Sequence, residues 1–110
     1  MQKIVIFITL LCVSGSVLAS DFENAEIKRL MLYRDFPDLV FIDLELERTD
    51  FLSCHTNRNW DFILDISDDF GKAIYSALLS MRLSGQHGKF TGTGSCSRYS
   101  YSETLKRITM

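Results

Sequence analysis

The stretch SDDFGKAIYSALLSMRLSGQHGKFTGTGSC, residues 67–96, decides the fold that we expect for this chain. Ser67 and Asp68 can accept hydrogen bonds from the free N–H groups at the start of a helix. Apolar residues then recur with a helical period, and Gly85 supplies the left-handed conformation that commonly ends a helix. The glycine- and threonine-rich segment that follows is typical of a bent strand, which we expect to end at Cys96. The apolar stripe that should face the core consists of Phe70, Ile74, Ala77, Leu78 and Met81.

Three strands are expected before this helix and one after the return strand. Residues 25–33 are apolar, but their alternation is interrupted at Lys28-Arg29, which indicates a bulge. In residues 40–47 one face is apolar, and the other carries Phe41 followed by three acidic residues; a further alternation runs from Trp60 to Ile66. A loop and a weakly patterned strand over residues 103–110 complete the chain. The predicted outer face of the second and third strands is acidic and carries Asp43, Glu45, Glu47, Asp61 and Asp65.

The resulting order is β-β-β-α-β-β, with the helix between the third and fourth strands. This is the order of the OB-fold, a small five-stranded Greek-key barrel. We expect a mainly β, OB-fold-like barrel, because closing the sheet removes exposed strand edges. The alternative is an open antiparallel sheet with one helix packed on it.

The N-terminus has the features of a secretory signal peptide over residues 1–19. Lys3 precedes an apolar run over residues 4–13, which is shorter than the roughly 20 residues that a membrane span needs. Small residues then lead to Ala19, after which we expect cleavage, with cleavage after Ser20 as the alternative. A single domain over residues 20–110 would remain, secreted or periplasmic, with 11 basic and 14 acidic residues and a formal charge of −3.

Two cysteines, Cys54 and Cys96, remain once the signal is removed. In an oxidising compartment an even pair indicates one disulfide. In the chain-entropy model such a bridge would stabilise the fold by roughly 4 kcal/mol. The sequence therefore predicts a Cys54–Cys96 disulfide.

No pattern in the chain predicts catalysis, a metal or a cofactor. His55 and Cys54 do not form a zinc site or a nucleophile pair if Cys54 is oxidised, and His87 has no companion ligand nearby. The carboxylates Asp65, Asp68 and Asp69 match no calcium loop, and helix capping explains two of them. We therefore expect a binding protein and not an enzyme.

The candidate ligand-binding residues are Arg98, Tyr99 and Tyr101, in the loop between the last two strands. OB-folds contact oligosaccharides or oligonucleotides with this loop. A tyrosine offers a flat face to a sugar ring, and arginine offers a fork of donors. The alternative is a loop whose tyrosines pack back on the barrel. The acidic outer face and secretion both argue against nucleic acid, so we expect a glycan or protein ligand.

From Cys54 onward, the sequence resembles a group of small, secreted, largely uncharacterised bacterial proteins. The resemblance covers about forty residues, and the segments that carry it are Cys54, the strand before Asp65-Ile66-Ser67, Gly71-Lys72, Tyr75-Ser76-Ala77-Leu78-Leu79, Ser84-Gly85 and Gly92-Thr93-Gly94-Ser95-Cys96. The layout is more distantly similar to the receptor-binding B subunits of bacterial five-plus-one toxins, which are OB-folds that form pentameric rings and bind glycans. The resemblance implies a binding module. The competing interpretation is a structural or assembly subunit, a homo-oligomeric ring former without a small ligand.

Overall fold

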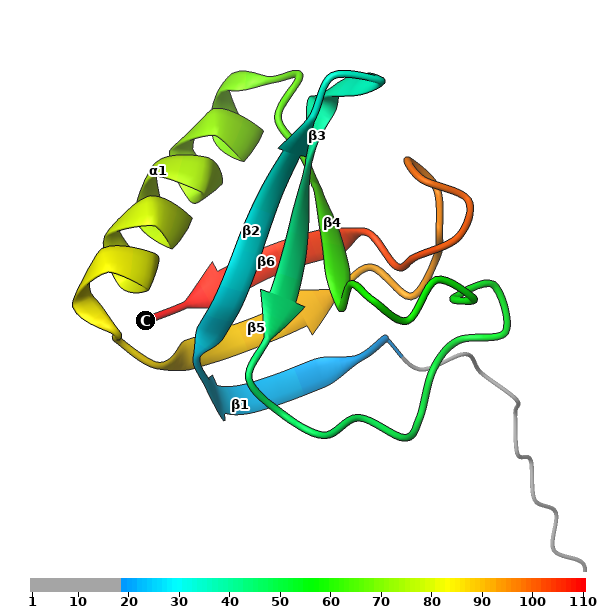
Figure 1. The fold of residues 1–110 in the computed structure, drawn as a ribbon, viewed down its shortest axis with the longest axis horizontal. Coiled ribbons are helices and arrows are strands. Elements are labelled where there is room, and N and C mark those ends of the chain that lie inside the picture. The colour runs from blue at the N-terminus through cyan, green and yellow to red at the C-terminus, as the bar shows by residue number, and fades with distance from the viewer. Residues whose placement is uncertain (1–18) are drawn as a thin grey trace, which may run out of the picture.

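A computed structural model describes residues 19–110, which form two three-stranded β-sheets and one helix (Figure 1). The signal-peptide prediction falls almost entirely outside the described residues. One sheet has the strand order β1-β5-β6 and the other β2-β3-β4. The elements are β1 (Asp21–Ala25), β2 (Ile27–Tyr33), β3 (Phe36–Leu44), β4 (Phe62–Asp65), α1 (Asp69–Ser84), β5 (Gly88–Gly92) and β6 (Leu105–Thr109).

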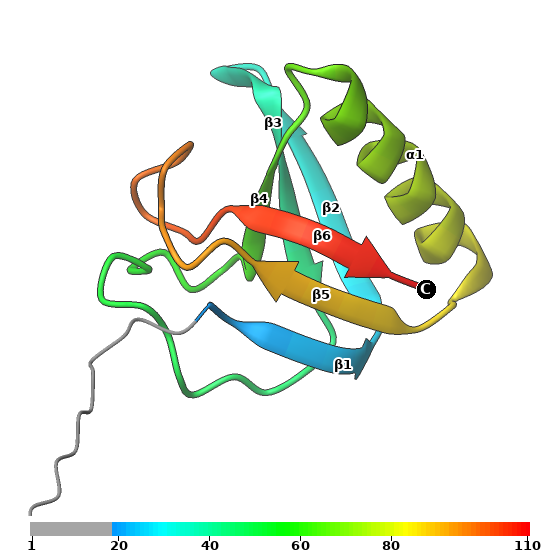
Figure 2. The same ribbon diagram turned by 180° about the vertical axis from the view of Figure 1, so that it is seen from behind.

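The two sheets are connected at two places. Strand β1 runs almost directly into β2, and the chain bends near Asn24, which has a left-handed backbone with φ 56°. An isolated parallel bridge between Ile63 of β4 and Thr104 links the other sides of the sheets. Figures 1 and 2 show the strands of one sheet running across those of the other, with α1 along one side.

The prediction of a five-stranded closed barrel is therefore wrong in two respects. Residues 19–110 contain six strands, arranged as two sheets. The strand predicted over residues 25–33 corresponds to β2, and the additional strand β1 precedes it in the other sheet, with irregular pairing to β5 between Phe22 and Ala25. Strand β1 could not be recognised in the sequence, because most of its residues are polar. The bulge predicted at Lys28 is present, since the register of β2 on β3 shifts between Ile27 and Arg29.

Helix α1 follows its sequence signals closely. The Asp68 carboxylate accepts a 2.7 Å hydrogen bond from the Gly71 N–H, and Gly85 ends the helix with φ 73°. The predicted stripe is buried at Ile74, Leu78 and Met81. Phe70 is an exception, with 65% of its surface exposed.

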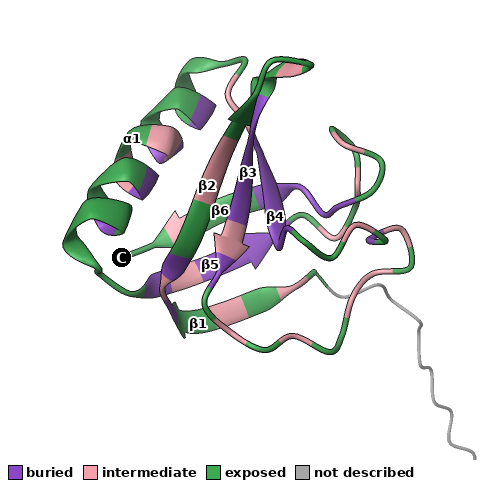
Figure 3. Cartoon of the chain, viewed as in Figure 1, coloured by how far each residue is buried: buried purple, intermediate pink, exposed green. Residues whose placement is uncertain are grey.

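The main core lies between the two sheets and the helix, where the buried positions of Figure 3 converge. A second, smaller cluster lies on the opposite face of the β2-β3-β4 sheet. Its residues are Leu39, Phe41, Trp60 and Ile63. The outer face that the sequence indicates as acidic is therefore partly apolar. The alternation places Trp60 on the face of Phe62 and Leu64, but Trp60 lies in this outer cluster, before the start of β4 at Phe62.

Candidate functional site

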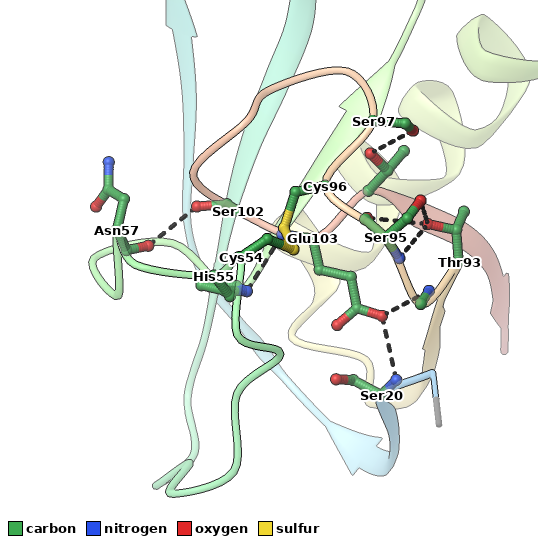
Figure 4. Close-up of a disulfide and its surroundings, with 12 residues drawn as sticks. Ser20, Cys54, His55, Asn57, Thr93, Ser95, Cys96, Ser97, Ser102 and Glu103 are labelled. Atoms are coloured by element: carbon green, nitrogen blue, oxygen red, sulfur yellow. Dashed lines mark hydrogen bonds between the residues drawn. A yellow bond between two sulfur atoms is a disulfide. The ribbon is translucent and has the colours of Figure 1, made fainter. Parts of the chain in front are cut away.

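A disulfide joins the two long loops of the molecule, residues 45–61 and 93–104. Cys54 and Cys96 are bonded, with their Cα atoms 6.1 Å apart, which confirms the predicted pairing (Figure 4). Hydrogen bonds join the loops beside the bridge. The N–H groups of Thr56 and Asn57 both donate to the Tyr101 carbonyl at 2.9 Å, and the Ser102 hydroxyl donates to the Asn57 carbonyl at 3.0 Å. The two loops therefore form one structural unit.

The first loop carries a buried arginine whose donors all have partners. Only 3% of the Arg48 side chain is exposed. Nη1 donates to the Asp61 carbonyl at 2.8 Å and approaches Asp61 Oδ1 at 3.5 Å. Nη2 donates to Ser20 Oγ at 2.7 Å and to Glu103 Oε1 at 3.2 Å, while Nε donates to the Asp50 carbonyl at 3.2 Å. The rings that surround the guanidinium are Phe22, Phe51 and Phe62.

Two buried carboxylates face this arginine. Asp61 Oδ2 accepts the Leu44 N–H at 2.8 Å, and burial raises the pKa of the Asp61 carboxyl against the opposing effects of this hydrogen bond and of Arg48. Glu103 is fully buried, and its Oε2 accepts the N–H groups of Ser20 at 3.1 Å and Gly94 at 3.0 Å. A Cβ at Gly92 would overlap the Glu103 carboxylate, so glycine is required there.

His55 completes this group, which we call the charged cluster: Ser20, Arg48, His55, Asp61 and Glu103. The Glu103 N–H donates to His55 Nδ1 at 3.2 Å, so Nε2 carries the proton and donates to the Trp60 carbonyl at 2.7 Å. Burial lowers the pKa of the imidazole, which is consistent with a neutral ring. Both ring nitrogens are thus occupied within the protein. Among residues 19–110, no group of three or more His, Cys, Asp or Glu side chains is placed to hold a metal ion.

The three residues predicted to bind a ligand lie in one loop but in different environments. Arg98 Nε is paired with Asp65 Oδ2 at 2.8 Å. Tyr99 is half-buried between the rings of Phe36 and Phe41, at 5.3 and 5.1 Å. Tyr101 is 56% exposed, and its ring lies 5.5 Å from that of Tyr99. Tyr99 therefore packs back on the sheet, as the alternative interpretation expected, whereas Tyr101 faces solvent.

These tyrosines extend a row of rings that starts in the β2–β3 turn. Tyr33 is 47% exposed, and its ring lies 5.9 Å from Phe36, which in turn contacts Tyr99. A hydrogen bond to Asp35 raises the pKa of the Tyr33 hydroxyl. The Tyr99 hydroxyl accepts a 3.1 Å hydrogen bond from Asn57 Nδ2. We call this row the aromatic surface: Tyr33, Phe36, Tyr99 and Tyr101.

The outer face is also less acidic than the sequence indicates. Asp43 pairs with Arg29 at 2.8 Å, and Asp65 pairs with Arg98. Asp61, predicted to be on this face, is buried against Arg48. Arginines contributed by other segments thus neutralise carboxylates that the alternation alone places in solvent.

Sequence reasoning missed both the charged cluster and the first half of the aromatic surface. Arg48 and Glu103 lie 55 positions apart, Arg48 in a segment that resembles an ordinary polar loop and Glu103 at the start of the predicted last strand. The one local signal was Gly92, whose lack of a side chain makes room for the Glu103 carboxylate. Tyr33 and Phe36 were assigned to a strand end and a turn, and only the β2–β3 pairing brings them beside Tyr99.

No family model, curated protein or solved structure matches this chain. The similarity to the secreted bacterial group and to toxin B subunits therefore stays a prediction. Within the described part of the chain, no helix is long and apolar enough to cross a membrane.

Proposed function

We propose that this protein is a secreted or periplasmic, non-enzymatic binding module that holds a glycan on its aromatic surface. The observation that carries this proposal is the continuous row of rings from Tyr33 to Tyr101, which is anchored at its centre and exposed at both ends. Exposed ring faces pack against the C–H faces of sugars, and the hydroxyls offer hydrogen bonds.

The topology supports an OB-fold-like arrangement for this module. Read from β2, the strands follow the order β2-β3-β4 and then β6-β5-β1, with the Ile63–Thr104 bridge between the sheets and β1 continuing into β2. With β1 and β2 taken as one bent strand, this is a five-strand order of the OB type. OB-folds bind ligands on the face of their second and third strands and with the loops after the first and fourth. The aromatic surface lies over these regions.

Polar groups beside the rings suit a neutral, hydroxyl-rich ligand. Asn57 and the Arg98–Asp65 pair lie next to Tyr99 and Tyr101 in the folded loops, and Asp35 lies beside Tyr33. Paired charges of both signs offer donors and acceptors without a strong positive field. A single-stranded nucleic acid instead requires a basic groove along its phosphates. We therefore favour a glycan over nucleic acid.

The test is a glycan array probed with the mature protein, together with variants of the surface. Tyr101→Ala and Tyr33→Ala remove the exposed rings and should abolish or strongly weaken binding of any glycan that the native protein retains. Phe70→Ala is the matched control, because Phe70 is an equally exposed ring at the start of α1. Binding that survives both tyrosine substitutions would refute the assignment. Micromolar binding of single-stranded DNA that weakens with salt would contradict the choice of ligand.

A second candidate function is an assembly subunit that contacts copies of itself. Within the described residues β2 pairs only with β3, so its other edge has no strand partner. Exposed apolar side chains lie on β2 and on the outer side of α1, namely Leu32, Leu79 and Leu83. An open groove of about 590 Å³ runs between these elements. Native mass measured over a range of concentrations separates the two functions, since a stable ring that Leu32→Lys dissociates would favour assembly.

A further inference from the structure

All three polar groups of Ser20 are held, by Gly92 of β5 and by the charged cluster. Its N–H donates to Glu103 Oε2 at 3.1 Å, and its hydroxyl accepts from Arg48 Nη2 at 2.7 Å. Its carbonyl accepts the Gly92 N–H at 2.8 Å. Figure 4 shows the Ser20 nitrogen directed at the Glu103 carboxylate. This is an unusually complete set of contacts for a residue that precedes the first strand.

The charged cluster lacks one positive charge. Arg48 supplies a single guanidinium, whereas Asp61 and Glu103 are two carboxylates, and the hydrogen bonds of His55 are those of a neutral ring. Glu103 has no exposed surface, and a buried charge is costly unless it is paired. The Ser20 nitrogen lies 3.1 Å from Glu103 Oε2, and it directly follows Ala19, the last residue of the predicted signal peptide.

We propose that hydrolysis of the Ala19–Ser20 bond frees the α-ammonium group of Ser20 and that Glu103 binds this group as its counter-ion. An endopeptidase of the signal-peptidase type adds one water to the bond. The oxygen goes to the Ala19 carboxylate, which leaves with the leader, and two protons go to the Ser20 nitrogen. Ala19 itself is exposed. The inference rests on the signal-peptide prediction and is independent of the proposed glycan site.

The hydrogen bonds of Ser20 also favour one of the two cleavage positions that the sequence predicts, after Ala19 or after Ser20. Cleavage after Ser20 would remove the three contacts described above, and Arg48 Nη2 would lose the shorter of its two hydrogen bonds. Cleavage after Ala19 keeps the three contacts and replaces the neutral amide donor by an ammonium donor, so the hydrogen bond between Ser20 and Glu103 becomes an ion pair. The exported protein should therefore begin at Ser20.

The first test determines the N-terminus of the full chain after export in a bacterial host. Intact mass and N-terminal sequencing should give a chain that starts at Ser20. A chain that starts at Asp21, or one that keeps the leader, would overturn the proposal. Failure of the glycan array leaves this outcome unchanged, so the two proposals are tested separately.

The second test asks whether the ammonium group is bound. The mature chain is compared with the same chain carrying one additional glycine before Ser20, which moves the charge away from Glu103. The extension should lower the melting temperature by about 5 °C or more, since a hydrogen bond to a charged group is worth more than a kilocalorie per mole in a domain of this size. In a Glu103→Gln background the extension should have little effect. Equal melting temperatures in the native background, or an unchanged difference in the Gln background, would refute the pairing.

A third measurement covers the case in which Glu103→Gln does not fold. Acylation of the α-amine requires its deprotonated, accessible form, so the Ser20 amine should react at least about tenfold more slowly than the amine of the glycine-extended chain. Equal rates would show that Glu103 does not hold the ammonium group.

Discussion

The charged cluster and the aromatic surface share the loop over residues 93–104, yet they differ in how their polar atoms are used. Arg48 and Glu103 are almost fully buried and are hydrogen-bonded within the protein. Tyr33 and Tyr101 instead present about half of their surface to solvent. We infer that the buried network holds the loops in place, so that the exposed rings are ordered before a ligand binds. Pre-ordered side chains bind a ligand with a smaller entropy cost.

The strongest test of this difference removes the buried cation. Arg48→Met keeps an unbranched side chain but leaves Asp61 and Glu103 without their guanidinium, and breaking a buried ion pair in this way costs about 3 to 5 kcal/mol. Urea unfolding of the mature protein should show this loss. Arg58→Met is the matched control, because the Arg58 guanidinium also stacks on Phe51, at 4.4 Å, but from an exposed residue. Similar losses in both variants would mean that stacking, and not the buried ion network, stabilises the loop.

Removal of the disulfide should have the next largest effect. The Cys54→Ala/Cys96→Ala double variant frees the two loops from each other and should lower the free energy of unfolding by about 2 to 5 kcal/mol. Alkylation of the native protein followed by mass spectrometry should find no free thiol at either position. Two reactive thiols in the native protein would contradict the bridge, and an unchanged melting temperature in the double variant would show that the remaining hydrogen bonds suffice.

Local signals explain why the helix could be predicted from the sequence, whereas the disulfide followed from the count of two cysteines outside the signal peptide. The Asp68 cap, the stripe through Ile74 and Leu78, and the Gly85 stop all act within a few residues of one another. The strand that was missed, β1, carries alternating polar residues and is stabilised by pairing with β5, nearly 70 positions away along the chain. Such pairing leaves little trace in the local pattern.

The candidate site divides in the same way. The loop of Tyr99 and Tyr101 could be predicted, because loops between the last two strands commonly carry ligand contacts in the expected fold. The burial of Arg48 and Asp61 could not be predicted from the sequence. Each charged side chain is buried only because it is paired with a residue of another segment. From the local sequence alone, such charged side chains are expected to face solvent.

A smaller, pH-dependent effect is expected from His55. Its pKa lies below the ordinary value of 6.5 in the folded protein, so the unfolded chain takes up the proton first as the pH falls. Its contribution to stability is therefore complete above pH 6.5 and is lost as the pH falls through the lower folded value. The raised pKa of Asp61 has the opposite sign and reduces stability as the pH rises above about 3.8.

Melting temperatures measured between pH 7.5 and 5 test the contribution of this histidine. His55→Gln should flatten the decrease that the native protein shows on the acid side. A decrease that persists in His55→Gln would assign it to other groups.

The smallest effect on stability is expected at the outer end of the aromatic surface. Tyr101 is more than half exposed and contacts only the neighbouring Tyr99 ring among the aromatic pairs of the described residues. Tyr101→Ser should therefore change the free energy of unfolding by no more than about 0.5 kcal/mol, as is usual for surface positions. Tyr99→Ser should cost about 1 to 3 kcal/mol, because that ring packs between Phe36 and Phe41. Both substitutions should reduce glycan binding, so only Tyr101 separates binding from stability. A loss above about 1 kcal/mol in Tyr101→Ser would place this ring with the core, and the aromatic surface would then have no exposed end in this loop.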